Sequence, residues 1–260
     1  MPTIRLDKLL ANRTPHSRSE VKQLLRQGAV QIDGVTERDG SRQIDPDAVQ
    51  VTCCGKLLPG GAHIYLLLNK PLGVICATED RRQQTVIDLL PPERRTKGLF
   101  PAGRLDADST GMVLLTDDGD LAHRMLSPKH HVPKFYLIRL ARPYEERYAA
   151  ALADGLTLSD GTHCLPAEIA PLPDNSHALV CLHEGKYHQV RRMMAALGNH
   201  VENLHRTAIG ELVMPVNLGL GEYLEIIHKD VENMLKEPQF WAVYERIMTN
   251  YSSYLINVSL

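Results

Sequence analysis

Apolar residues in the first thirty positions recur at the spacing of helices. They predict one helix over residues 4–10 and a second helix that opens at Ser17, because Ser17 and Glu20 have the spacing of a capping box. Gly28 is the predicted end of this second helix. Its expected buried stripe consists of Val21, Leu24 and Leu25.

Beyond the second helix the pattern changes to alternation of apolar and polar residues. Val30 and Ile32 lead into the turn Asp33-Gly34, and residues 49–51 predict a partner strand. Two helices followed by a short hairpin therefore predict a small α/β domain, which we assign to residues 1–60.

The segment 57–61 contains a proline and two glycines and predicts a linker to a larger domain over residues 61–227. The strands predicted in this domain are residues 65–68, 112–115, 135–140, 178–182 and 220–227, and the helices are residues 85–90, 121–126, 144–152 and 188–197. This irregular alternation favours an α+β fold with a mixed or antiparallel sheet. No glycine-rich strand-turn-helix signature points to a nucleotide-binding fold.

The remaining residues, 228–260, form a C-terminal segment. A helix over residues 231–244 is predicted to pack on the sheet of the larger domain. The final ten residues are polar and β-branched, and we assign no function to them.

Composition indicates a soluble globular protein. Of the 260 residues, 43% are hydrophobic and 23% are charged, which suffices for one good-sized core and a small satellite domain. No apolar run approaches the roughly eighteen residues that cross a bilayer, and the N-terminus lacks the apolar stretch of a signal peptide. We therefore expect a cytoplasmic monomer without a membrane partner.

The cysteines and histidines suggest neither disulfides nor metal. The five cysteines are odd in number and contain no Cys-x-x-Cys pair, which argues against a disulfide framework and against a zinc ribbon. The paired histidines near residues 130 and 188 lack the helical His-Glu spacing of a zinc hydrolase. We expect free thiols and no metal or organic cofactor.

Charge is distributed unevenly along the chain. The formal net charge is −2, but residues 1–30 carry six basic and only two acidic residues. A basic patch on a mildly acidic body can bind phosphate locally without making the whole surface attractive to nucleic acid.

One acidic residue lies in an unusual context. Asp106 belongs to the stretch Gly103-Arg104-Leu105-Asp106-Ala107-Asp108-Ser109-Thr110-Gly111, which precedes an apolar run. It is therefore expected on a loop held against a sheet, with Arg104 nearby to keep its carboxylate ionised. A lone loop aspartate is more often the cap of a turn, so further motifs must decide its role.

Two further blocks decide it. With Gly103-Arg104-Leu105-Asp106, the segments Lys134-Phe135-Tyr136 and Glu184-Gly185-Lys186-Tyr187-His188-Gln189-Val190-Arg191-Arg192 resemble the signature of RNA pseudouridine synthases of the small-subunit rRNA type. Three blocks in the right order are far more specific than any one of them. The N-terminal domain resembles the S4 RNA-binding domain, through residues 5–9 and 30–34.

The resemblance assigns roles to two residues, and a local pattern assigns a role to a third. It implies that Asp106 is the catalytic carboxylate and that Tyr136 stacks on the target base. Arg191 lies on the flank of a predicted buried stripe, from which we expect it to pair with Asp106 and lower the pKa of that carboxyl group. Asp106 could add to the base, attack the sugar or remove a ribose proton, because all three routes need the same group.

A wider set of basic residues is predicted to bind RNA. Arg104 is expected to help with the backbone or the flipped nucleotide, and Arg192 to meet solvent or phosphate. Lys70-Pro71-Leu72-Gly73 resembles a further family block, for which a structural role as a strand end with a turn suffices. The predicted RNA-binding residues are Arg5, Lys8, Arg18, Lys22, Arg26, Arg104, Lys134 and Arg192.

These observations predict an enzyme that isomerises a uridine of ribosomal RNA. Within the family, the block at residues 127–131 and that at residues 198–206 look most like those of enzymes acting on uridine 516 of 16S rRNA, in a small-subunit assembly intermediate. A synthase for 23S rRNA or tRNA and a non-catalytic RNA-binding assembly factor are the alternatives. A hydrolase using Asp106 with Asp108 is weaker, because the two carboxylates would be too close for a water between them.

Overall fold

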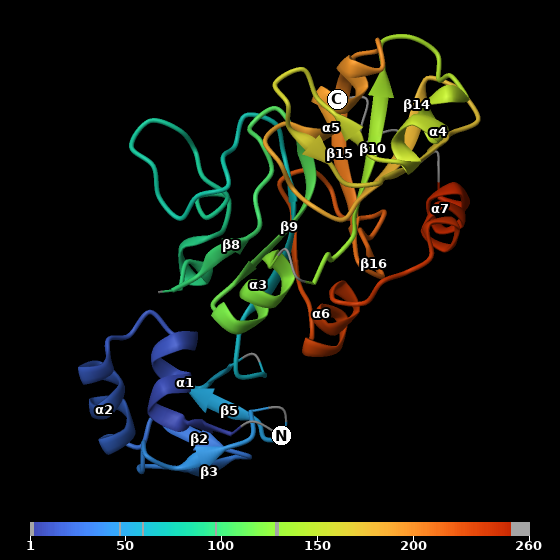
Figure 1. Cartoon of the computed structure of the whole chain (residues 1–260). Helices are drawn as coiled ribbons and strands as arrows, with labels where there is room; N and C mark the ends of the chain where they lie inside the picture. The colour runs from blue at the N-terminus through green and yellow to red at the C-terminus, as the bar shows by residue number, and fades with distance from the viewer. Residues whose placement is uncertain (1–2, 47, 59, 97, 128–129, 251–260) are drawn as a thin grey trace.

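The computed structural model describes residues 3–46, 48–58, 60–96, 98–127 and 130–250. A small N-terminal unit lies below a larger body built on one sheet (Figure 1). Within the described part of the chain, no helix is long and apolar enough to span a membrane. Pro59 of the predicted linker, residues 128–129 of one family block and the final ten residues lie outside the described residues.

The N-terminal unit contains the two predicted helices, α1 (Leu6–Arg13) and α2 (Arg18–Arg26). The predicted capping box is confirmed, since the Glu20 N–H donates to Ser17 Oγ at 3.3 Å and the Ser17 N–H donates to Glu20 Oε2 at 2.7 Å. Gly28, with φ of +74°, follows the helix as predicted. The apolar stripes of both helices pack on the small sheet in one core, which includes Leu6, Leu9, Leu10, Val21, Leu25 and Val30.

The small sheet has more strands than the sequence pattern predicted. Its order is β3-β2-β5-β6, with β2 (Val30–Ile32), β3 (Val35–Thr36), β5 (Val51–Cys53) and β6 (Lys56–Leu57). A separate pair joins β1 (Ile4–Arg5) to β4 (Gln43–Ile44), so α1 begins only at Leu6. These strands have two or three residues each, which is too short to show a period in the sequence.

The larger body is built on a mixed sheet, which confirms the predicted fold class. Its strand order is β13-β14-β10-β15-β9-β7-β17, and every neighbouring pair is antiparallel except β15 with β9. The strands are β7 (Tyr65–Lys70), β9 (Thr110–Thr116), β10 (Lys134–Leu140), β13 (Glu168–Pro171), β14 (His177–Leu182), β15 (Val201–Ile209) and β17 (Tyr223–Glu225). Short strands β8 (Phe100–Ala102) and β16 (Leu212–Val213) pair with β9 and β15, and β11 (Leu156–Thr157) pairs with β12 (His163–Cys164).

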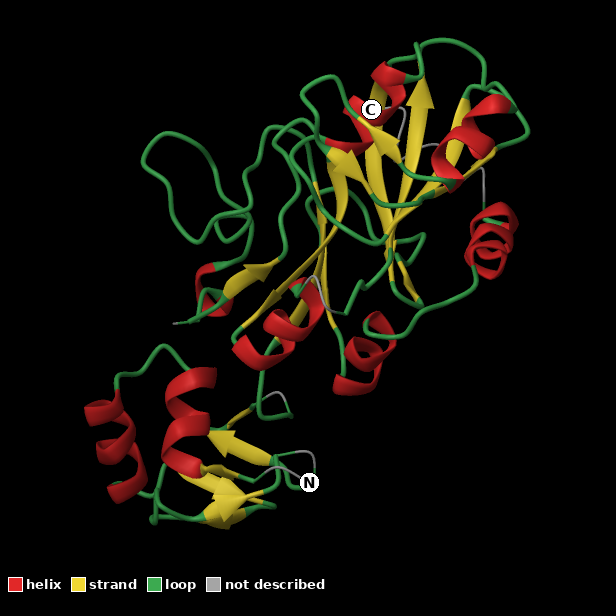
Figure 2. Cartoon of the chain, in the orientation of Figure 1, coloured by secondary structure: helices red, strands yellow, loops and turns green. Residues whose placement is uncertain are grey.

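Helices cover both faces of this sheet (Figure 2). One face packs against α4 (Arg147–Ala153) and α5 (Gln189–Ala196), and the other against α3 (Gly119–Leu126), α6 (His228–Met234) and α7 (Phe240–Thr249). Side chains alternate between the two faces along β10, since Tyr136 and Ile138 belong to the first core and Phe135 and Leu137 to the second.

Three predicted elements differ in the structure. Residues 85–90 form turns rather than a helix, because the Asp88 carboxylate accepts hydrogen bonds from the Thr85 N–H and hydroxyl, and two prolines follow at once. The strand predicted over residues 220–227 is limited to β17. The single C-terminal helix is two helices, since Pro238 lies between α6 and α7 and removes a helical donor.

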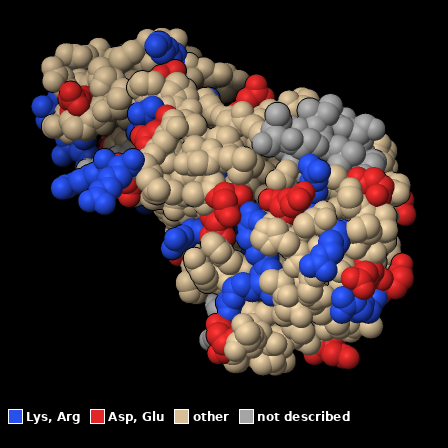
Figure 3. All heavy atoms as spheres, turned by 90° about the horizontal axis from the view of Figure 1, so that it is seen from above, with Lys and Arg blue, Asp and Glu red and all other residues tan. Residues whose placement is uncertain are grey.

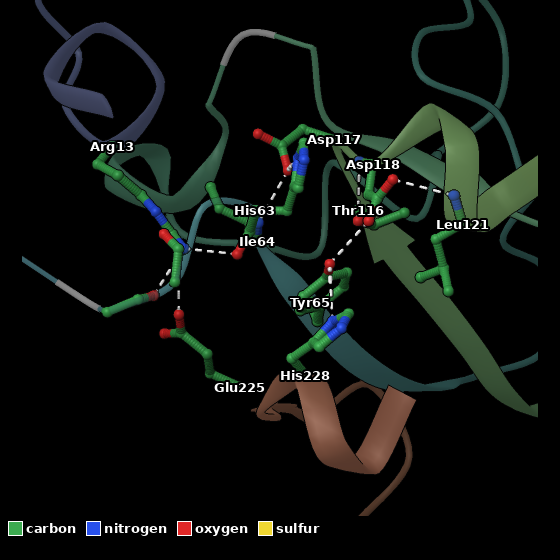
Figure 4. A network of polar contacts seen from close by, with 12 residues as sticks. Arg13, His63, Ile64, Tyr65, Thr116, Asp117, Asp118, Leu121, Glu225 and His228 are labelled. Atoms are coloured by element: carbon green, nitrogen blue, oxygen red, sulfur yellow. Dashed lines mark hydrogen bonds and ion pairs between the residues drawn. The ribbon is translucent and has the colours of Figure 1, made fainter. Parts of the chain in front are cut away.

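A buried arginine joins the two parts of the molecule (Figure 4). Arg13, at the end of α1, donates from one terminal nitrogen to the carbonyls of Gly60, Gly61 and His63 at 2.6–3.0 Å. Its other terminal nitrogen lies 3.5 Å from a carboxylate oxygen of Glu225 on β17, and its side chain is only 2% exposed. The linker is therefore held between α1 and an edge strand of the large sheet.

Next to Arg13, the first residues of the large domain are fixed by two aspartates. His63 lies 3.2 Å from an Asp117 carboxylate oxygen, and this hydrogen bond raises the pKa of His63. The Tyr65 hydroxyl donates to Asp118 at 2.7 Å, and Asp118 also caps α3 by accepting from the Leu121 N–H. The path of the chain out of the linker is thus tied to the start of α3.

Candidate active site

The loop that carries Asp106 connects β8 to β9 and is fixed by backbone hydrogen bonds. The Ser109 N–H donates to the Asp106 carbonyl at 3.1 Å, which closes a turn over Ala107 and Asp108. From outside the loop, the Gly73 N–H donates to the Ala107 carbonyl at 2.8 Å. The turn after β7, which the sequence marked only as a strand end, therefore supports the Asp106 loop directly.

Arg206 of β15 fixes the same loop from the other side. Its Nε donates to the Met112 carbonyl at 2.8 Å and one terminal nitrogen donates to the Arg104 carbonyl at 3.3 Å. This approach requires Gly111, where φ is +107° and a β-carbon would lie 2.4 Å from the Arg206 carbonyl oxygen. The glycine that closes the sequence motif thus allows β9 and β15 to lie close together.

Asp106, Tyr136 and Arg191 all line one cavity of about 320 Å³, which we call the Asp106 cavity. Tyr136 comes from β10 and is only 8% exposed, while the Asp106 side chain is 44% exposed toward the cavity mouth. Arg104 lines the cavity as well. The structure therefore brings together the three residues that the sequence proposed from segments up to eighty-five positions apart.

The expected pairing of Arg191 with Asp106 is wrong for this structure. Arg191 lies 3.3 Å from the carboxylate of Asp108 and donates to the Asp108 carbonyl at 3.0 Å, and its other terminal nitrogen donates to the Val201 carbonyl at 2.7 Å. The turn between Asp106 and Asp108 directs the two carboxylates to different neighbours. Arg191 therefore ties the Asp106 loop to α5 and to the start of β15.

His188 is the titratable neighbour of Asp106 that sequence reasoning missed. Its Nε2 lies 3.6 Å from Asp106 Oδ2, and its ring stacks on Tyr187 with centroids 3.9 Å apart. The backbone of His188 is left-handed, with φ of +48°, immediately before α5. A non-glycine residue in this region is uncommon, and such residues cluster at functional sites. The signal available in the sequence was its place inside the third family block.

Lys70 is a second cation near the loop. It is fully buried, its ammonium donates to the Pro71 carbonyl at 2.8 Å, and burial lowers its pKa to about 8. The charges of Cys76, Asp108 and Asp106 oppose this shift, so the protonated lysine is stabilised by the aspartates of the loop.

The predicted RNA-binding residues fall into separate groups. Arg5, Lys8, Arg18 and Lys22 border one hollow on the N-terminal unit, where Arg5 also pairs with Asp7, and Arg26 is exposed on α2. Arg192, expected to meet solvent or phosphate, instead forms an ion pair with Asp160. Figure 3 shows basic and acidic side chains intermingled on the face seen from above, in keeping with the low net charge.

Within the described residues, no group of three or more His, Cys, Asp or Glu side chains is arranged to hold a metal ion. The cysteines described are free thiols. The side chains that line the Asp106 cavity include carboxylate, phenol, imidazole and guanidinium groups.

Two segments of the chain match known protein families. Residues 64–196 match the family described as RNA pseudouridylate synthase, and residues 4–49 match the S4 domain. The first match contains the Asp106 loop, β10 and all of α5, and the second contains both N-terminal helices.

Several bacterial proteins are similar to this chain over nearly its whole length. An uncharacterised RNA pseudouridine synthase of Bacillus subtilis is 45% identical over 91% of this chain and all of its own length. Ribosomal small subunit pseudouridine synthase A of Haemophilus influenzae is 41% identical, and that of Escherichia coli 34% identical, over 90% and 89% of this chain and all of theirs. A crystal structure of a pseudouridylate synthase is 40% identical, with a TM-score of 0.62 over 89% of this chain and 99% of that one.

Proposed function

Because this chain belongs to the RNA pseudouridylate synthase family and carries an S4 domain, we propose that it isomerises one uridine of ribosomal RNA, uridine 516 of 16S rRNA. The enzyme class, an RNA pseudouridine synthase, follows from the family itself. The observation that carries the proposal for the site is the convergence of Asp106 and Tyr136 on one cavity. Its relatives named as small-subunit synthases support the choice of RNA.

The reaction needs no redox step. The bond from uracil N1 to ribose C1′ breaks, a bond from C5 to C1′ forms, N1 gains a proton and C5 loses one. A carboxylate placed beside the sugar and the base can serve this exchange as nucleophile or as base. We assign this role to Asp106, whose carboxylate lies at the cavity, and leave its three routes open.

Two further residues are assigned to the detached base. Tyr136 lines the cavity from a rigid strand, so its ring can hold a base by stacking, which contributes about 1–3 kcal/mol. Arg104 lies at the same cavity and is assigned to the flipped nucleotide, since the target base must leave its stack to reach Asp106.

Arg191 is assigned a positioning role in place of the direct ion pair. Its contacts with Asp108 and with the Val201 carbonyl fix the turn on which Asp106 depends. An error of about 1 Å in the placement of a reacting group can reduce a rate about a hundredfold. Anchoring of the turn is therefore sufficient to make Arg191 important for catalysis.

RNA capture is assigned to the N-terminal domain. The basic residues Arg5, Lys8, Arg18 and Lys22 border one hollow, and Arg26 is exposed on the same helix as Lys22. Lys134 and Arg192 of the large domain are assigned to the same RNA. We propose residues 1–60 as the RNA-binding domain, 61–227 as the catalytic domain and 228–260 as a C-terminal addition. The proposed partner is 16S rRNA in a small-subunit assembly intermediate, bound by a monomer.

Mapping pseudouridine in all cellular RNA, from cells with and without the protein, tests this proposal. We expect a single uridine of 16S rRNA to lose its modification, and re-expression of wild type to restore it while Asp106→Asn does not. Loss at a site in 23S rRNA or tRNA would contradict the proposed target. An unchanged map together with retained RNA binding would favour the non-catalytic assembly factor.

A further inference from the structure

A second cavity of about 400 Å³ adjoins the Asp106 cavity. The two share Arg104, Gly185 and the ring-bearing residue Tyr136 as lining. The second cavity is lined in addition by Lys134 and Arg206, and we call it the cationic cavity. Tyr136 thus lies between the Asp106 cavity, which we assign to the base, and the cationic cavity.

Lys134 and Arg206 reach the cationic cavity from neighbouring strands. Lys134 is two residues before Tyr136 on β10, so both side chains point to the same face of the sheet. Arg206 lies directly opposite Tyr136 on β15. The geometry of the sheet itself therefore places two cations beside the proposed stacking residue.

Both cations have unused hydrogen-bonding capacity. Arg206 is 3% exposed, and one of its terminal nitrogens is buried with no partner among the described residues. The Lys134 ammonium donates to the Val132 carbonyl at 2.8 Å, which accounts for one of its three protons. A buried hydrogen-bond donor without an acceptor costs folding free energy. An acceptor supplied by a bound molecule would remove that cost.

The acidic residue at the cationic cavity is already neutralised. Glu184 pairs with Lys186, and its carboxylate also accepts from the Leu165 N–H and the Gln189 amide. Burial, and to a smaller extent the nearby charge of Arg206, lower the pKa of Lys134 to about 8. Two cations held close together in a low-dielectric site, without a carboxylate for either among the described residues, form a site for an anion.

We propose that Lys134 and Arg206 bind a backbone phosphate of the RNA, next to the uridine whose base enters the Asp106 cavity. This subsite rests on the proposed function and deepens it. A phosphate is the anion that lies within one nucleotide of any RNA base, and it accepts several charge-assisted hydrogen bonds at once. Holding it would fix the ribose of the target while the base is detached and turned.

The first test measures RNA affinity against salt concentration, with 16S rRNA fragments and Lys134→Gln in the full chain. Loss of one phosphate contact should reduce the log-log salt slope by about 0.7 and the affinity by about tenfold or more. Lys229→Gln removes the same charge from an exposed position on α6 and should leave both at the wild-type values. A wild-type slope and affinity for Lys134→Gln would overturn the subsite.

The second test locates the phosphate. Neutral methylphosphonate linkages are placed one at a time within two nucleotides of the modified uridine, and kcat/KM is measured. At one position, the neutral linkage should reduce kcat/KM of the wild-type enzyme about tenfold or more. The same linkage should not reduce kcat/KM of Lys134→Gln any further, because that variant already lacks the contact. Equal losses in both proteins at every linkage would contradict the subsite. A wild-type enzyme that modifies no uridine would refute the proposed function, whereas the salt test would still decide the subsite.

Discussion

At the scale of single residues, Asp106 and Asp108 are two positions apart and have different neighbours. Asp106 faces the cavity and His188, whereas Asp108 is bound by Arg191. Their roles can therefore be separated by substitutions that remove one charge and keep the shape of the side chain.

Asp106→Asn should reduce kcat by at least about a thousandfold, because it removes the charge that the chemistry needs. The RNA dissociation constant should stay near wild type, since Asp106 lies away from the basic N-terminal hollow. Asp108→Asn is the matched control and should retain most of the rate. Single-turnover isomerisation and equilibrium binding measure both quantities, and turnover by Asp106→Asn would remove Asp106 from the mechanism.

Arg191→Met should reduce kcat about a hundredfold by releasing the turn that carries Asp106. If Arg191 acts by position, the loss is the same at every pH. If it acted by keeping a carboxylate ionised, the rate would recover as the pH rises. The double variant with Asp108→Asn should be no slower than Arg191→Met alone, because Arg191→Met already removes the partner of the Asp108 carboxylate. A rate–pH profile of each variant distinguishes the two roles.

His205 predicts a pH dependence of stability. It is fully buried beside Thr110, and burial lowers its pKa from 6.5 to about 4. Between these values the unfolded chain binds the proton and the folded one does not, so stability is lost as the pH falls from 6.5 toward 4, by roughly 3 kcal/mol in total. Urea unfolding of wild type and His205→Gln across this range should show a shallower acid loss in the variant. Parallel curves would exclude this contribution.

At the scale of elements, the contact of β9 with β15 is the one that brings the Asp106 loop to Arg206. The two strands are parallel here, and Gly111 lies opposite Arg206. Because a side chain at position 111 would meet the Arg206 backbone, the contact depends on the absence of a β-carbon.

Gly111→Ala should destabilise the protein by at least about 2 kcal/mol, since it adds overpacking against backbone to an unfavourable φ. Gly221→Ala is the matched control, because its φ is +83° and no atom lies within 4 Å of the added methyl group. It should cost only about 1–2 kcal/mol. Chemical denaturation measures both, and equal losses would mean that the close approach contributes nothing.

At the scale of the whole molecule, a buried arginine joins the N-terminal domain to the large domain, and the buried apolar residues described in the two domains form separate clusters. Arg13 satisfies three carbonyls of the linker and pairs with Glu225 of the large sheet. This arrangement sets the direction from the basic hollow to the Asp106 cavity.

Arg13→Met should free the N-terminal domain. The three linker carbonyls lose their hydrogen-bond donor, and the methionine side chain carries no charge to pair with Glu225. We expect two separate thermal transitions, a larger radius of gyration and weaker RNA binding, with kcat at saturating RNA nearly unchanged. Glu225→Gln removes the charge that pairs with both Arg13 and Arg94 but leaves the hydrogen bonds from Arg13 to the linker carbonyls, so it should have a smaller effect on each measurement. A single transition with wild-type dimensions for Arg13→Met would show that other contacts hold the domains together.

Those elements that depend on interactions between neighbouring residues could be predicted from the sequence alone. The capping box at Ser17, the buried strands β7, β9, β10 and β14, and the order of the three motif blocks could all be recognised, because neighbouring residues carry these signals. β15 was missed as a strand, since its buried His205 and Arg206 interrupt the apolar pattern. These two polar residues are buried because they form hydrogen bonds with residues that are distant in sequence.

Tertiary structure alone decided which charged groups meet. Three contacts join segments that are distant in sequence. Arg191 meets Asp108, His188 approaches Asp106, and Lys134 and Arg206 line the same cavity. The turn closed by Ser109 and Asp106 places the carboxylate of Asp108, and not that of Asp106, beside Arg191. Hydrophobic periodicity specifies faces of strands and helices, whereas charge pairing depends on distances of a few ångströms that only packing sets.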